Sequence, residues 1–160
     1  MTIFLTISIM LGIAALLSLF ILKKYFHSTE LVTFWLFISS MLFIFSNIIE
    51  LNYKWIRLNN EITVFWILTI IRLIVIPCLC VWLLLIYSSK EINRTIKMIC
   101  TGLWFVLLIG LQFLLKTLNL IQFKQWNFYF SFVEWLILWF LAVGYWSTFR
   151  VLLKKEGVIE

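Results

Sequence analysis

Five polar side chains lie inside or at the edges of long apolar stretches, and their chemistry stands out in this sequence. Arg72 and Glu134 interrupt two such stretches, while Glu50, Asn47 and Gln112 lie close to the ends of two others. In a bilayer, a carboxyl group and a guanidinium can form an ion pair, bind a ligand or ion, or pass a proton. Placing an arginine at the bilayer centre costs about 2.5–3.5 kcal/mol on insertion scales, so such a residue is a candidate functional site.

The overall composition indicates that these residues belong to a membrane protein. Of 160 residues, 64% are hydrophobic and 12% are charged, whereas soluble domains are about half apolar and about a quarter charged. One spanning helix needs roughly 20 apolar residues, so five spans leave too little chain for a soluble catalytic or DNA-binding domain. A cytosolic enzyme, a secreted disulfide scaffold and a disordered tail are therefore excluded.

Runs without charge define the elements that must position the polar residues. They predict an all-α fold, an integral membrane bundle of five transmembrane helices that forms a single domain over residues 1–160. The expected spans are about 2–22, 31–51, 62–87, 98–115 and 127–149. The alternating pattern of barrel strands does not accompany them, and the stretch 117–127 is expected to lie on the outer membrane surface.

The basic residues of the loops predict an orientation. Loops on one side hold eight Lys and Arg residues and loops on the other hold four, which favours an outside N-terminus and a cytoplasmic C-terminus. The first group is Lys23, Lys24, Lys90, Arg94, Lys97, Arg150, Lys154 and Lys155, and the second is Lys54, Arg57, Lys116 and Lys124. The expected location is the plasma membrane, and abundant Ile, Phe and Asn favour a bacterial source.

In this topology all five polar residues lie in the outer half of the bilayer. Helical spacing places Glu50 and Gln112 on stripes that are expected to face the bundle interior. The stripes are Ser40, Phe43, Asn47 and Glu50 in the second span, and Thr101, Phe105, Leu108 and Gln112 in the fourth. The single proline, Pro77, is expected to loosen the third helix by freeing a carbonyl near Leu73.

Two interpretations of this cluster remain open. In the first, Arg72 and Glu134 form a buried ion pair, and Glu50, Asn47 and Gln112 take up the remaining hydrogen bonds to fix helix register. In the second, the five residues line a cavity that is open to the outside and binds a small ligand, a lipid headgroup or an ion. The second interpretation also allows proton passage at Glu134.

Several chemistries lack the residues that they need. The sequence has no aspartate, and His27 is its only histidine, which excludes paired-aspartate proteases and bis-histidine haem. Cys78, Cys80 and Cys100 form no CxxC motif and are expected to be small buried side chains. We therefore expect no catalytic residue, no metal site and no cofactor. Nucleic acid is not expected as a partner, because no basic run is long enough to follow a phosphate backbone.

The expected function is that of a small, non-catalytic membrane protein. A chain with almost no mass outside the bilayer acts through its helix faces, as an accessory or regulatory subunit or as a sensor, with the lipid bilayer and other membrane subunits as partners. The alternative is a small ion- or proton-coupled transporter or channel that uses Glu134 and Arg72. A lipid-modifying enzyme with Glu134 or Glu50 as acid and base ranks last, because no nucleophile or metal site accompanies them.

Overall fold

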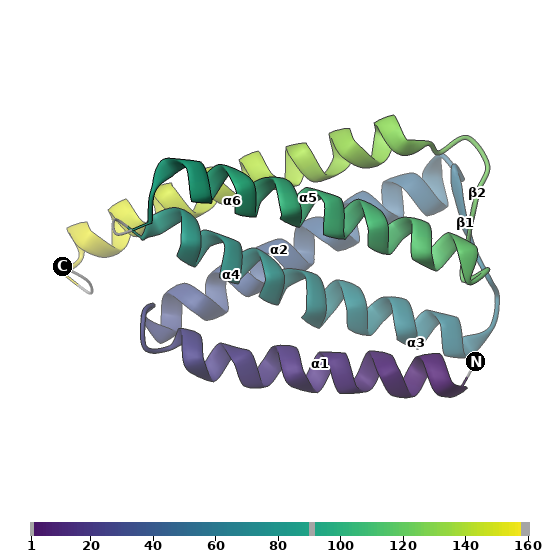
Figure 1. Cartoon of the computed structure of the whole chain (residues 1–160), viewed down its shortest axis with the longest axis horizontal. Coiled ribbons are helices and arrows are strands. Elements are labelled where there is room, and N and C mark those ends of the chain that lie inside the picture. The colour runs from purple at the N-terminus through teal and green to yellow at the C-terminus, as the bar shows by residue number, and fades with distance from the viewer. Residues whose placement is uncertain (1, 90–91, 158–160) are drawn as a thin grey trace.

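Five helical segments lie side by side along the long axis of the protein and alternate in direction (Figure 1). The computed structural model describes residues 2–89 and 92–157. The segments are α1 (Thr2–Leu22); α2 (Ser28–Asn47) with the π-helical turn η1 (Ile48–Asn52); α3 (Ile62–Ile70), the π-helical turn η2 (Ile71–Val75) and α4 (Ile76–Ser88); α5 (Arg94–Thr117); and α6 (Phe128–Lys155).

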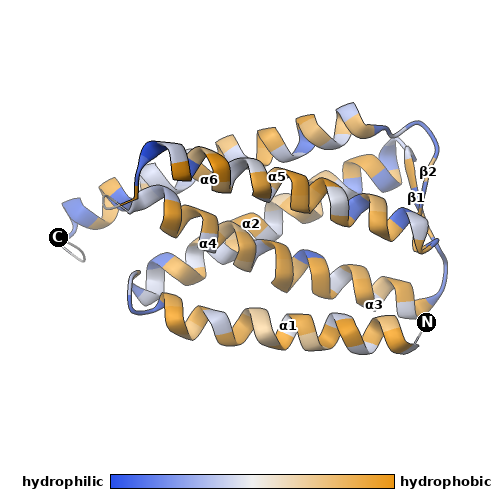
Figure 2. Cartoon of the chain, in the orientation of Figure 1, coloured by the Kyte–Doolittle hydropathy of each residue, from blue (hydrophilic) through white to orange (hydrophobic). Residues whose placement is uncertain are grey.

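All five segments are long and apolar enough to cross a membrane, so the five predicted helices are confirmed. Apolar residues cover the outside of the bundle along most of its length (Figure 2). The fourth and fifth helices are longer than the expected spans. Helix α5 includes Arg94 and Lys97 in its first turn, and α6 includes Lys154 in its last turn. Charges at helix ends reach the headgroup region, so they do not end a helix.

The third segment, α3–η2–α4, is the centre of the bundle. It contacts α1, α2 and α5, while α6 packs against α2 and α5. In its most apolar stretch 56% of the residues are buried, against 17–28% in the other four segments. Helix α1 packs at the edge, where a methyl group added at Gly12 would lie 3.0 Å from Ile70. The central position of the third segment explains why its one charge, Arg72, is surrounded by protein.

Pro77 accounts for the local geometry of this central segment. Without an N–H group it cannot bond the carbonyl of Leu73, and the π-helical turn η2 lies immediately before it. The Ser39 hydroxyl of α2 has two acceptors within reach, the Trp35 carbonyl of its own helix at 2.9 Å and the Leu73 carbonyl at 3.4 Å, which share its one proton. The irregular turn η2 therefore lies where the sequence predicted that the third helix would loosen, and Ser39 of α2 contacts it there.

A short antiparallel ribbon joins two loops at one end of the bundle. Strand β1 (Ile56–Leu58) pairs with β2 (Ile121–Phe123) in the register Ile56 with Phe123 and Leu58 with Ile121. The N-terminus lies at the same end, here called the ribbon end, and the C-terminal end of α6 lies at the opposite, tail end (Figure 1). The stretch 117–127 was expected only to lie on the membrane surface, so its pairing with the 53–61 loop is an addition from the structure.

Candidate functional site

An ion pair between Arg72 and Glu50 links the second and third helical segments near the ribbon end. The Arg72 guanidinium donates from Nη1 to Glu50 Oε2 at 3.1 Å, and its Nη2 bonds Oε1 of the same carboxylate. The side chains are only 21% and 9% exposed, respectively. Two parallel bonds between a guanidinium and a carboxylate are stronger and more directional than one. Arg72 is therefore held in a fixed position by the neighbouring segment.

Both partners of this pair lie in π-helical turns. Glu50 is in the middle of η1, where the Tyr53 N–H bonds the carbonyl of Ile48, and Arg72 is in η2. A π-helical turn contains one more residue than an α-helical turn, so it shifts the following side chains around the helix. Such turns are rare and often occur at functional sites. Their presence in two facing segments, at the two charged residues, makes this region a candidate site.

A second polar pair lies between α5 and α6. The amide of Gln112 donates from Nε2 to Glu134 Oε2 at 2.9 Å. The carboxyl group of Glu134 therefore has an amide as its partner, while Arg72 is paired with Glu50. This differs from the direct Arg72–Glu134 ion pair of the first sequence-based interpretation. The two pairs together form the cavity cluster, defined as Glu50, Arg72, Gln112 and Glu134.

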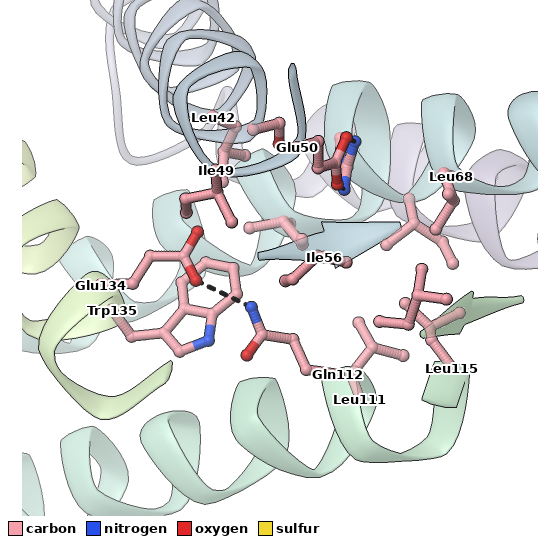
Figure 3. A pocket seen from close by; sticks show the side chains of 15 residues that line it. Leu42, Ile49, Glu50, Ile56, Leu68, Leu111, Gln112, Leu115, Glu134 and Trp135 are labelled. Atoms are coloured by element: carbon pink, nitrogen blue, oxygen red, sulfur yellow. Dashed lines mark hydrogen bonds and ion pairs between the residues drawn. The ribbon is translucent and has the colours of Figure 1, made fainter. Parts of the chain in front are cut away.

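The cavity cluster surrounds an enclosed space inside the bundle (Figure 3). The cavity has a volume of about 50 Å³, which is room for about three or four waters. All four members of the cluster line it, and most of the other lining side chains are apolar. Ile56 of β1 and Ile121 of β2 line it as well, so the ribbon covers this end of the cavity.

Two buried polar atoms at the cavity have no protein partner. Within the described residues, Gln112 Oε1 and the indole Nε1 of Trp135 form no hydrogen bond, and both side chains line the cavity (Figure 3). Trp135 is only 3% exposed. A buried polar group without a partner costs about 1–3 kcal/mol. A bound water or ligand that offers an acceptor to Trp135 and a donor to Gln112 would remove this cost.

The cavity borders an open groove at the ribbon end. Glu50 and Ile56 line both spaces. The groove is larger, about 700 Å³, and polar residues such as Lys54, Arg57 and Gln122 line it. In the ribbon, Arg57 and Gln122 are exposed while Ile56 and Ile121 are buried, as expected from the alternation of side chains along a strand. Glu50 therefore stands between the enclosed cavity and the surface of the protein.

Asn47 does not join the other four residues. It is exposed on the outside of the bundle, as is Ser40, so the inward stripe expected for the second span is wrong at these positions. The buried stripe of α2 runs instead through Leu31, Phe34, Ile38, Leu42 and Ser46. Ser40 can face outward because its hydroxyl bonds the Leu36 carbonyl of its own helix. In the fourth span, Leu108 is buried and Gln112 lines the cavity, so that expected stripe does face inward.

A further polar group at the tail end was not expected from the sequence. Glu30, at the start of α2, is 2% exposed and accepts a hydrogen bond from Trp146 Nε1 at 3.0 Å. Its Oε1 lies 3.2 Å from Arg150 Nε, and the Arg150 guanidinium lies over the Trp146 ring at 5.0 Å. We call Glu30, Trp146 and Arg150 the tail-end cluster. In the sequence, Glu30 and Arg150 only mark the ends of apolar runs, and Arg150 counts among the basic residues that predict the orientation. The four-residue spacing of Trp146 and Arg150 is the one sequence signal for this cluster.

The possible metal ligands of the described residues lie apart from one another. Among these residues, no group of three or more His, Cys, Asp or Glu side chains is arranged to hold a metal ion. The cavity lining contains one hydroxyl, Ser46, but neither a histidine nor a cysteine. What the cavity offers is a carboxyl, a paired guanidinium, an amide and an indole, which are groups that bind small polar molecules.

Comparison with known proteins yields no relative for this chain, since no family model, no curated protein and no solved structure matches it.

Proposed function

We propose that this chain is a non-catalytic, multi-pass plasma-membrane protein that acts as a sensor or as an accessory or regulatory subunit. Its ribbon end and N-terminus face the outside, and its C-terminus is cytoplasmic, as the loop charges favour. The cavity cluster binds a small polar ligand or a lipid headgroup in the outer half of the bilayer. A bacterial membrane is the proposed setting.

One observation carries this proposal: the enclosed cavity holds two unpartnered polar atoms and adjoins a groove on the surface. A ligand that enters from the groove meets Glu50 first and then reaches Gln112 and Trp135. The Glu50–Arg72 pair joins two π-helical turns, so a ligand that competes for either partner acts on two helical segments at once. Movement of these segments is the signal that a partner subunit would detect.

A catalytic role finds less support at this site. Activation of a hydroxyl nucleophile needs a base within hydrogen-bond reach and a third group that orients the base. Ser46 is the only hydroxyl among the described lining residues, and no histidine accompanies it. Binding, with the chemistry left to another subunit, is the use that the site supports best.

Purification from native membranes tests the proposal. We expect the tagged chain, extracted in a mild detergent, to bring down a stoichiometric membrane partner. The same purification with Trp135→Phe and Gln112→Leu shows whether occupancy of the cavity affects that association, and Trp66→Phe, an exposed tryptophan of α3, is the matched control. A monodisperse chain without a partner that transports ions when reconstituted alone contradicts the proposal.

A proton- or ion-coupled transporter is the second candidate, and the charges of the cavity cluster favour it. The cluster contains one cation and two carboxyl groups, and Arg72 is already paired with Glu50. The cluster is electrically balanced when one carboxyl holds a proton, and Glu134 is the one without a cation partner. Proteoliposomes that contain a pH-sensitive dye test this function: a pH-dependent flux that Glu134→Gln abolishes would replace the first proposal.

A further inference from the structure

A second cleft lies at the tail end of the bundle, whereas the cavity cluster lies near the ribbon end. It opens between the end of α4, the start of α5 and the middle of α6, and its volume is about 700 Å³. Arg94 and Lys97 line its mouth, and Met98, Thr101 and Trp139 line its walls. From Arg94 to Thr101 the helix rises by about 10 Å, so the cleft runs from the helix end toward the apolar part of the bundle.

The mouth of this cleft is suited to an anion. None of the described lining residues is acidic, and the two ion pairs of the described residues, Glu50–Arg72 and Glu30–Arg150, involve neither Arg94 nor Lys97. Lys97 Nζ donates to the Tyr87 carbonyl at 2.8 Å, which fixes the ammonium at the mouth and leaves its other two N–H bonds available. The start of α5 adds the positive end of a helix dipole.

The walls are suited to a hydrocarbon chain. The Met98 side chain is 68% exposed, and Trp139 meets the Tyr87 ring edge-on at 5.9 Å. Cationic residues over an apolar cleft between membrane helices form the usual arrangement for an anionic lipid. We propose that this cleft binds one anionic phospholipid, with its phosphate on Arg94 and Lys97 and an acyl chain along Met98 and Trp139. This site does not depend on the function proposed for the cavity cluster.

Lipid-dependent thermal stability tests the charge requirement. The full chain is stripped of lipid in a neutral maltoside detergent, and phosphatidylglycerol or phosphatidylcholine with identical acyl chains is added. We expect phosphatidylglycerol to raise the Tm by about 5 °C near saturation and phosphatidylcholine to leave it unchanged. Arg94→Gln with Lys97→Gln removes this difference. Lys154→Gln with Lys155→Gln, which removes the same charge from the last turn of α6, retains it.

Fluorescence quenching tests the acyl chain and works even if the cleft variant fails to fold. At equal mole fraction, phosphatidylglycerol with brominated acyl chains is expected to quench tryptophan emission more than brominated phosphatidylcholine, and Trp139→Phe removes the excess. Equal quenching by both lipids overturns the proposal. So does an equal Tm rise with phosphatidylcholine, or loss of the difference in the Lys154/Lys155 control. If inorganic phosphate alone reproduces the shift, the site holds a free anion and the lipid assignment is wrong.

Discussion

The two buried polar clusters of this protein share one helical segment but differ in composition. Each uses a carboxylate of the second segment, Glu30 at the tail end and Glu50 near the ribbon end. In the tail-end cluster one carboxylate meets one guanidinium and one indole, and the adjoining space, about 10 Å³, does not exceed a single water. The cavity cluster adds a second carboxyl, an amide and a larger cavity.

The two clusters also differ in how far their charged groups are exposed. At the tail end, Arg150 is 37% exposed, so its charge reaches the membrane surface while Glu30 stays buried. In the cavity cluster, Arg72 lies on the central segment with its side chain 21% exposed. Among the described residues, Glu50 is the one carboxylate that forms an ion pair with it. The Glu30–Arg150 ion pair joins α2 to α6, whereas the cavity cluster has one more carboxyl group than cations and lines a cavity of about 50 Å³.

The largest expected effect is at Arg72. Arg72→Ala leaves the Glu50 carboxylate without its cation, and removal of one partner from a buried ion pair costs about 3–5 kcal/mol. Thermal or SDS unfolding in detergent measures the loss. Arg57→Ala, on the exposed face of the ribbon, is the control and should change stability little. Wild-type stability and activity for Arg72→Ala would show that the pair neither holds the fold nor prepares the site.

A smaller loss is expected at the tail end. Arg150→Ala should cost about 1–2 kcal/mol, because Glu30 keeps its hydrogen bond from Trp146 and the lost partner was partly solvated. The same unfolding assay compares it with Lys154→Ala, which removes a charge one turn further along α6. If Arg150→Ala costs as much as Arg72→Ala, the distinction between the two clusters is wrong.

Glu134→Gln is expected to separate stability from function. The amide retains the shape of the side chain and can still accept a bond from Gln112, so the free energy of unfolding should change by about 1 kcal/mol or less. Glu50→Gln, the matched change, leaves Arg72 without a countercharge and should destabilise more. A larger loss for Glu134→Gln than for Glu50→Gln would show that Glu134, rather than Glu50, compensates the arginine.

The smallest effect concerns the stretch of α2 between the clusters. Ser39→Ala removes a hydroxyl shared between the Trp35 carbonyl of its own helix and the Leu73 carbonyl of the third segment, and it should cost about 0.5–1 kcal/mol. Ser40→Ala is the adjacent control, since that hydroxyl bonds only within its own helix, and it should be nearly neutral. Equal losses in the unfolding assay would mean that the long Ser39 bond contributes nothing across the helices.

The helices were predictable because apolar length alone specifies them. The first span was expected at 2–22 and is Thr2–Leu22, and Pro77 marked the irregular part of the third. The ribbon was not predictable, since three-residue strands in loops far apart in sequence leave no periodic pattern. Charges at helix ends were equally ambiguous. Glu30 and Lys23 both flank an apolar run in the sequence, but Glu30 is buried, because it packs against α6, while Lys23 is exposed.

The sequence predicted some residues of the cavity cluster correctly and misplaced another. Gln112 and Glu134 were placed by ordinary helical spacing, which holds in α5 and α6. Asn47 was misplaced because the stripe through Ser40 was assigned to the interior, whereas the buried face of α2 passes through Ser46. Pro77 signals the π-helical turn at Arg72, but no proline accompanies the turn at Glu50, so the pairing of these two residues followed from the structure alone.

The positions of the two ribbon strands in the chain also determine when the cavity can form during synthesis. Its first strand precedes the third helical segment and its second strand follows the fourth. A nascent chain that has not yet reached Ile121 already contains Glu50 and Arg72, but it lacks the strand that covers them and the Gln112 partner Glu134. The charged pair is therefore synthesised before its cover, and the cavity lining is complete only once the chain has reached Glu134 and Trp135 of α6.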